Sequence, residues 1–165
     1  MIFSKLFSRK AQPTLGLYEA IVAAARRPFF YAEWGVPDTI DGRFDMIVLH
    51  LYLALDRLRG ESYDFRQALS EMFFSDMDRS IREMGASDVS VGKKVRRMAE
   101  AFSGRVEAYE KARAEGPAAM EQAFERNVFG GKVGNLAALR EWFDATLESL
   151  KRQNTSEIML GKVSF

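Results

Sequence analysis

Apolar residues recur every three or four positions along most of this chain, which is the spacing that gives an α-helix one apolar face. The clearest example begins near residue 38 or 41 and ends at residue 59, where Gly60 follows as a helix stop. Its apolar positions are Phe44, Ile47, Val48, Leu51, Leu55 and Leu58. This pattern predicts a helix at the centre of the fold.

Further helices are predicted over residues 15–27, 65–84, 90–109, 117–126 and 136–150. Pro28 stops the first of them, and Ser90 and Asn135 are residues that cap helix starts. The alternation typical of strands is hardly seen. The sequence therefore predicts an all-α fold, with a single compact bundle of about five to seven helices over residues 14–152.

Residues 29–42 are predicted to form a loop that holds the densest aromatic cluster of the chain. The cluster consists of Phe29, Phe30, Tyr31 and Trp34. Large aromatic side chains in a short loop either fill the core or anchor a partner, because such residues contribute most of the energy at binding hot spots. Both interpretations stay open at this point.

The two ends of the chain differ from the predicted bundle. Residues 1–13 are predicted to form a basic amphipathic arm, with Lys5, Arg9 and Lys10 ahead of the first acid, Glu19. A helical arm would carry apolar side chains, among them Phe3, Leu6 and Phe7, on one side, with the cations nearer the lipid headgroups. The alternative is a disordered leader. Residues 153–165 lack a helical period and are predicted to be a loosely attached tail.

Composition excludes several classes of function. The chain has no cysteine, which removes disulfides, thiolate nucleophiles and cysteine-bound metals. Its 24 Lys and Arg nearly equal its 23 Asp and Glu, so the chain lacks the strong positive field of proteins that bind DNA. No apolar stretch approaches the roughly 20 residues needed to cross a bilayer. We expect a cytoplasmic protein without cofactor, metal or catalytic residues.

His50 is the only histidine, and it lies on the predicted central helix. One histidine cannot build a multi-histidine zinc site. Arg43, His50 and Arg57 are seven residues apart, which predicts a half-buried polar stripe beside the apolar face. Asp76 and Asp78 point away from each other on a helix, so we expect them to be solvated instead of acting as an acid–base pair.

A basic run consists of Lys93, Lys94, Arg96 and Arg97. It either forms an ordinary solvated helix face or binds a partner such as RNA, the ribosome or an acidic protein surface. Acidic residues that soon follow on the same segment favour the solvated face.

Several stretches taken together resemble the ubiquinol-cytochrome c chaperone family. They are Arg-Pro-Phe-Phe-Tyr (27–31), Gly-Val-Pro-Asp-Thr (35–39), Gly-Arg-Phe-Asp (42–45), Leu-His-Leu (49–51), Asp-Arg-Leu (56–58), Asp-Met-Asp-Arg-Ser-Ile-Arg-Glu-Met-Gly (76–85), Asp88, Val-Gly-Lys-Lys (91–94), Phe-Ser-Gly-Arg (102–105) and Tyr109. The resemblance covers residues 18–112 in continuous order and weakens over the last third.

The resemblance implies an all-helical fold without enzymatic activity. It also implies a client, cytochrome b, whose insertion into the cytochrome bc1 complex the mitochondrial members assist, working at the ribosome with a small partner protein. Ser103 stands where the family commonly has an aromatic residue. The chain also lacks the long amino-terminal extension of a mitochondrial precursor, which suggests a bacterial relative.

A chaperone for a membrane protein needs exposed apolar surface with charge at its rim, so that it can hold and release a transmembrane segment. We expect that surface at Phe29, Phe30, Trp34, Val36, Arg43 and His50. The first functional hypothesis is an assembly chaperone for cytochrome b, attached to the inner membrane at its periphery. The second is a helical RNA- or ribosome-binding module that acts through the basic run.

Overall fold

The computed structural model describes residues 2–165, with side chains from residue 14 onward, and these residues contain helices and no strand. The helices are α1 (Ile2–Ala25), α2 (Pro28–Ala32), α3 (Ile40–Arg57), α4 (Tyr63–Glu83), α5 (Asp88–Glu115), α6 (Pro117–Asn127), α7 (Leu136–Arg152) and α8 (Thr155–Met159). Six of them are long and two span five residues each, which confirms the predicted all-α bundle.

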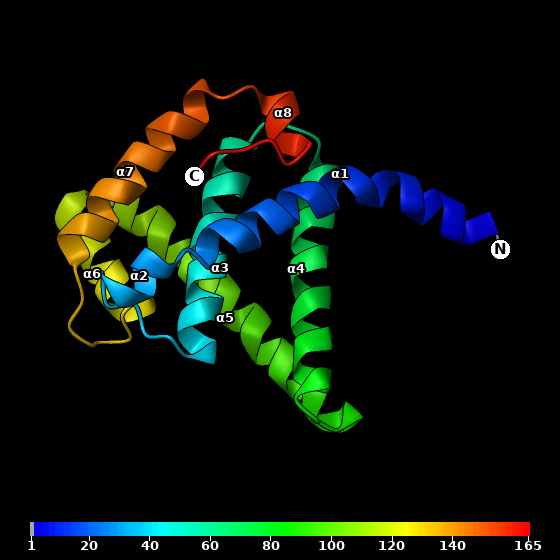
Figure 1. The fold of residues 1–165 in the computed structure, drawn as a ribbon, viewed down its shortest axis with the longest axis horizontal. Coiled ribbons are helices and arrows are strands. Elements are labelled where there is room, and N and C mark those ends of the chain that lie inside the picture. The colour runs from blue at the N-terminus through cyan, green and yellow to red at the C-terminus, as the bar shows by residue number, and fades with distance from the viewer. Residues whose placement is uncertain (1) are drawn as a thin grey trace.

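Helix α3 lies at the centre, as its apolar pattern predicts (Figure 1). Every residue from Phe44 to Ala54 is buried, which requires neighbours on all sides. Helices α1, α5 and α7 supply these neighbours. The only polar or charged side chains in this buried stretch are those of Asp45, His50 and the tyrosine Tyr52.

The start of α3 depends on a close approach between backbone segments. The hydroxyl of Thr39 accepts a hydrogen bond from the N–H of Gly42 at 3.1 Å and so caps the helix. A Cβ atom at position 42 would lie 1.9 Å from the carbonyl oxygen of Pro37. The turn from Pro37 into α3 can therefore be this tight only because residue 42 is glycine.

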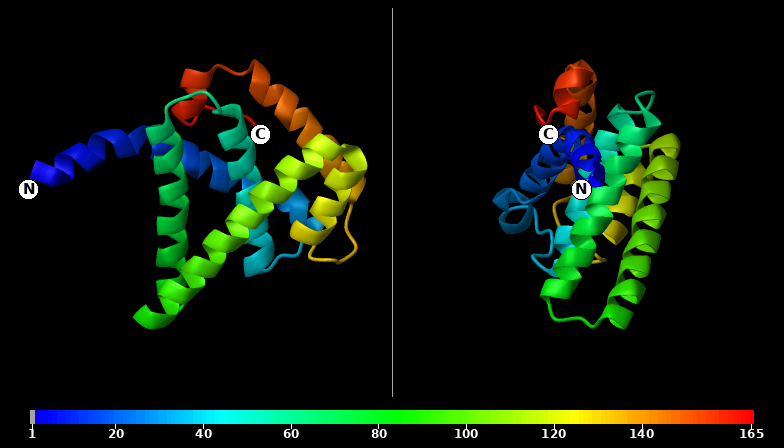
Figure 2. Two further views of the ribbon diagram at one scale, coloured as in Figure 1. Left: turned by 180° about the vertical axis from the view of Figure 1, so that it is seen from behind. Right: turned by 90° about the vertical axis from the view of Figure 1, so that its right-hand side faces the viewer.

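Helices α4 and α5 form a hairpin whose closed end lies far from α7 and α8 (Figures 1 and 2). The two helices pack against each other. Gly85 closes the hairpin with a φ of 84°, a value that glycine adopts without strain. Met84 and Val89, on either side of the turn, are 57% and 76% exposed.

The amino-terminal helix is longer than predicted. Helix α1 begins at Ile2 instead of residue 15, and its first half extends away from the other helices (Figure 1). The apolar residues near its start already have helical spacing, and the backbone continues that pattern through the predicted boundary at residue 13. The side chains of Phe3, Lys5, Leu6, Phe7, Arg9 and Lys10, on which the amphipathic arm depends, lie outside the described residues.

The prediction of a loosely attached tail is wrong. Asn154 caps the short helix α8 by accepting a hydrogen bond from the N–H of Glu157 at 3.2 Å, and Ile158 is fully buried. The backbones of Gly16 and Gly161 pack together so closely that a Cβ atom on Gly161 would lie 2.5 Å from the carbonyl carbon of Gly16. Helix α8 is too short to show a helical period in the sequence.

Candidate functional site

The predicted aromatic loop folds into helix α2 and packs against the centre of the molecule. Phe30 is fully buried and lies at the middle of a cluster of rings. Its ring centroid is 4.3 Å from Phe29, 5.0 Å from Trp142, 5.3 Å from Trp34 and 5.5 Å from His50. We call these five side chains the aromatic cluster. It joins α2, α3 and α7.

The expected exposure of this site is only partly correct. Phe30 and His50 are fully buried and Val36 is 2% exposed, so the prediction that they lie on the surface is wrong. The N–H of Val36 donates to the carbonyl of Phe30 at 3.0 Å, which folds the segment after α2 back over the core. Phe29 and Trp34 are half-buried and keep part of their surface in solvent. Core packing is therefore the main role of the cluster in this fold.

His50 is held as a neutral side chain inside the aromatic cluster. Its Nδ1 lies 2.8 Å from the carbonyl oxygen of Met46, one helical turn earlier. Burial lowers the pKa of His50 to about 4, because the surrounding rings cannot solvate a charged imidazole. Its Nε2 atom is buried and has no hydrogen-bond partner among the described residues.

The predicted half-buried stripe of Arg43, His50 and Arg57 does not form. Arg43 is exposed, with its Nε 2.8 Å from Oδ1 of Asp38, whereas His50 is fully buried. Arg57 is half-buried and donates to the carbonyls of Leu150 at 2.7 Å and Gln153 at 2.9 Å. These carbonyls lie at the carboxyl end of α7, so Arg57 caps that helix.

A cleft of about 610 Å³ lies beside α2. It is lined by Arg26, Pro28, Tyr31, Ala32, Asp38 and Arg43. The hydroxyl of Tyr31 donates to the carbonyl of Ala25 at 2.8 Å, which fixes the ring at the cleft wall. The cleft thus combines apolar surface of α2 with Arg26 and with the ion pair between Arg43 and Asp38.

The carboxyl-terminal residues cover another side of the aromatic cluster. The ring of Phe165 lies 5.3 Å from that of His50, centroid to centroid. Arg27 donates from Nη1 to the carbonyl oxygen of Phe165 at 2.9 Å. Gln153 accepts from the N–H of Ser164 at 2.9 Å and donates to its carbonyl at 2.7 Å.

An ion pair links α3 to α5 beneath the surface. The Nε atom of Arg105 lies 2.6 Å from Oδ1 of Asp45, and the guanidinium also lies over the ring of Phe44. Burial raises the pKa of Asp45 to about 7, although Arg105 lowers it in part. Tyr109, one turn after Arg105, is fully buried. The pair fixes how α5 crosses α3.

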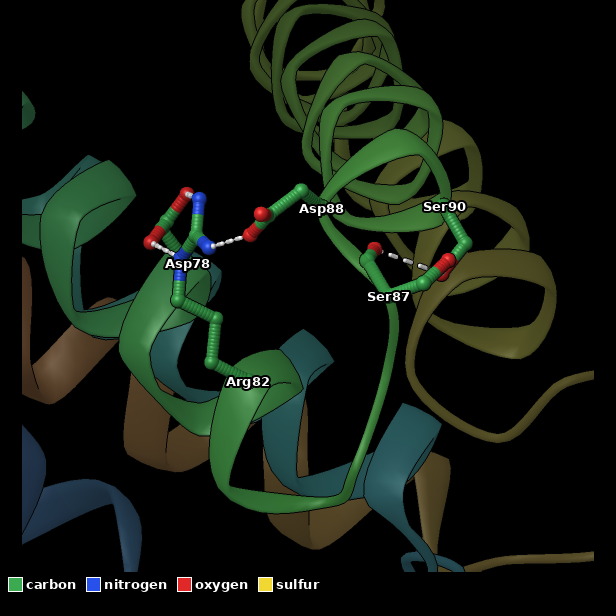
Figure 3. Close-up of polar contacts among 5 residues, drawn as sticks. All are labelled: Asp78, Arg82, Ser87, Asp88 and Ser90. Carbon is green, nitrogen blue, oxygen red and sulfur yellow. Dashed lines mark hydrogen bonds and ion pairs between the residues drawn. The ribbon is translucent and has the colours of Figure 1, made fainter.

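The basic run lies on the first half of α5, near the closed end of the hairpin. All four of its side chains are exposed, and none forms an ion pair with any side chain from residue 14 onward. Arg82 engages the nearby acids instead, with contacts of 2.7 Å to Asp78 and 2.5 Å to Asp88 (Figure 3). The run Lys93, Lys94, Arg96 and Arg97 is therefore an unneutralised basic surface.

Asp76 is not solvated as expected. It accepts a hydrogen bond from the hydroxyl of Tyr18 at 2.7 Å and lies 2.5 Å from a guanidinium nitrogen of Arg79. It therefore joins α4 to α1.

The part of the chain that the structure describes contains no group of three or more histidine, aspartate or glutamate side chains arranged to hold a metal. Within the same part, no helix is long and apolar enough to cross a membrane.

Sequence reasoning does not assign several residues of the site. The spacing of Trp142 predicts a core position in the last long helix and carries no sign that it meets Phe30. Arg27, Gln153 and Phe165 lie far apart in sequence, and only the fold brings them to one side of the cluster. The sequence gives one signal for this site, which is that Arg27 and Phe30 both occur in the stretch 27–31 that resembles the family.

Comparisons with known families and structures show which family the chain belongs to. A family model described as ubiquinol-cytochrome C chaperone matches residues 32–165. The chain belongs to this family. The crystal structure of the Cbp3 homolog from Brucella abortus is 35% identical, with a TM-score of 0.81 over 100% of this chain and 96% of that chain. No match was found among curated protein sequences.

Membership in the ubiquinol-cytochrome c chaperone family confirms the resemblance and supports a chaperone role in assembly of the bc1 complex. It also favours a role without catalysis. Several of the family-like stretches now have structural reasons. Gly42 permits the tight turn into α3, and Asp45 of α3 pairs with Arg105 of α5. Arg82, at the end of α4, pairs with Asp88, at the start of α5.

Proposed function

We propose that this protein binds cytochrome b and assists its assembly into the bc1 complex. The family match over residues 32–165 is the observation that carries this proposal. A membrane protein that waits for its partner subunits exposes apolar helices, and a chaperone must cover them weakly enough to release them. Deleting the gene in the native host should lower cytochrome b and assembled bc1 complex in membranes. An unrelated membrane protein should keep its level.

The client contacts the half-buried face of the aromatic cluster and the neighbouring cleft. Phe29 and Trp34 supply apolar contact, and Arg43 supplies charge at the rim. Phe30, Val36 and His50 lie beneath them and hold this surface in place. Aromatic side chains in such positions bury large areas at a small cost in conformational entropy.

Co-purification of cytochrome b with the double variant Phe29→Ala and Trp34→Ala tests this surface. We expect the variant to remain folded and to retain much less cytochrome b than the native chain. Tyr63→Ala is the matched control, because Tyr63 is an aromatic residue that is 69% exposed at the start of α4. Equal recovery of cytochrome b with all three proteins would show that the client does not bind this surface.

The exposed basic run supports a second candidate function, binding of RNA or the ribosome. Four cations without ion pairs to described side chains, on one short helical stretch, suit a phosphate backbone. Binding through phosphates weakens steeply with salt, with a slope of about −0.7 to −0.9 per neutralised phosphate in a double-logarithmic plot. Co-sedimentation with ribosomes at increasing salt separates this function from apolar client binding. The double variant Lys93→Gln and Arg96→Gln, measured in the same way, tests the basic run.

For location, we propose the cytoplasmic face of the inner membrane, with peripheral attachment through residues 1–13. The amphipathic pattern of this arm and the backbone extension of α1 support the proposal. Flotation with vesicles that contain anionic lipid tests it. Loss of flotation after Phe3→Ser and Phe7→Ser together is expected, and unchanged flotation would assign attachment to another surface.

A further inference from the structure

Residues 163–165 follow helix α8 without forming a helix or strand of their own, and they pack against the aromatic cluster at Phe165. Their only hydrogen bonds to other parts of the described chain come from the side chains of Arg27 and Gln153. Within this segment both side chains bond to backbone atoms alone, namely the N–H and carbonyl of Ser164 and the carbonyl of Phe165, while Gln153 also donates to the hydroxyl of Ser149 at 3.0 Å. Such contacts accept almost any residue sequence.

The side chain of Phe165, in contrast, meets a surface with a definite preference. Its ring packs against the ring of His50, which in turn lies 5.0 Å from that of Trp142. These rings select a large apolar or aromatic side chain. Recognition of peptides commonly divides in this way, with main-chain hydrogen bonds for affinity and a pocket for specificity.

The ring of His50, against which Phe165 packs, also carries an unsatisfied polar atom. Its Nε2 is completely buried without a hydrogen-bond partner among the described residues, although buried polar atoms are nearly always paired. The side chain of Phe165 offers this nitrogen no polar group. A different segment could bring a hydroxyl or amide to it.

We propose that Arg27, His50, Trp142 and Gln153 form a subsite for an extended segment of a protein partner, and that residues 163–165 occupy it when the partner is absent. The identity of the partner as cytochrome b rests on the proposed function. The bound segment would place a large apolar side chain where Phe165 now lies, and its backbone would replace that of Ser164 on Gln153.

The full-length variant Phe165→Ala weakens the internal occupant without shortening the chain. The probe is a synthetic peptide with the sequence of residues 160–165, and a matched peptide carries alanine in place of its phenylalanine. The native segment competes at an effective concentration in the millimolar range because it is tethered. We therefore expect the probe to bind the variant at least about tenfold more tightly than it binds the native chain.

The ring signals of His50, the only histidine, report binding directly in NMR spectra. They should shift with the probe and not with the alanine peptide. Gln153→Ala, introduced together with Phe165→Ala, should abolish the shift, whereas Lys162→Ala, at an exposed position, should leave it unchanged. Absence of binding, or equal binding of the two peptides, would overturn the subsite. Should Phe165→Ala fail to fold, Phe165→Leu takes its place with a smaller expected gain in affinity, and the same two results would overturn the subsite.

A second measurement separates the subsite from the proposed function. Detergent-solubilised cytochrome b is added to the complex of the Phe165→Ala variant with the probe. Displacement of the probe supports cytochrome b as the occupant. Probe binding that cytochrome b does not reverse would uphold a peptide subsite and overturn cytochrome b as its partner.

Discussion

Replacing Gly42 by alanine is expected to destabilise the protein, although alanine favours helices. The new Cβ would lie 1.9 Å from the carbonyl oxygen of Pro37, whereas ordinary contact begins at 3.4 Å, so the two atoms must separate by about 1.5 Å. Overpacking of this kind costs about 1–3 kcal/mol, and displacement of the Thr39 cap adds about 1 kcal/mol. The higher helix propensity of alanine returns about 1 kcal/mol. A net loss of about 1–3 kcal/mol follows.

Urea unfolding followed by circular dichroism at about 222 nm measures this loss, and the melting temperature should fall by about 2–4 °C for each kcal/mol. Gly104→Ala is the matched control, because Gly104 lies in the middle of α5 and a Cβ atom added there would have no neighbouring atom within 4 Å. The control should stabilise the protein by about 0.5–1 kcal/mol. Shifts of the same sign in both variants would refute the packing argument at Gly42.

Three further predictions concern the side chains of His50, Asp45 and Arg57. The pKa of His50 is lowered to about 4 from 6.5, so its stabilising effect as a neutral group is present above pH 6.5 and lost as the pH falls; its NMR signals should not titrate with a midpoint near 6.5. The pKa of Asp45 is raised to about 7 from 3.8, so its contribution to the free energy of unfolding declines as pH rises between these values, and Asp45→Asn should remove that decline in urea titrations at several pH values. Arg57→Lys should destabilise the protein by about 1–3 kcal/mol, because lysine cannot keep the same set of hydrogen bonds to the end of α7. The exposed Arg126, which forms no ion pair with a described side chain, provides the control Arg126→Lys, and equal unfolding midpoints for both variants would contradict the cap.

The sequence is sufficient to predict the long helices because each must bury one face, and that requirement repeats along the chain. Helices α2 and α8 escape prediction because five residues barely exceed one helical turn. The predicted start of α1 is too late, although the apolar spacing continues toward the amino terminus. Helical periodicity thus identifies elements that are long enough to repeat their pattern.

The candidate site is harder to predict because it depends on contacts between distant segments. The composition of the loop at residues 29–42 indicates the importance of its aromatic residues. It cannot distinguish a fully buried ring, such as that of Phe30, from a half-buried one, such as that of Trp34. This difference depends on which residue packs against α3 and α7. Likewise, Asp45 and Arg105 are each visible in family-like stretches, while their pairing depends on how α5 crosses α3.

The position of the two tryptophans gives the protein a built-in optical reporter. Trp34 and Trp142 are the only tryptophans of the chain, and both lie within about 5 Å of the ring of Phe30, at centroid distances of 5.3 Å and 5.0 Å. Excitation of indole therefore reads the polarity of one small region, without a background from elsewhere. Emission wavelength and quenching can follow occupancy of this region in real time, on the unlabelled native protein.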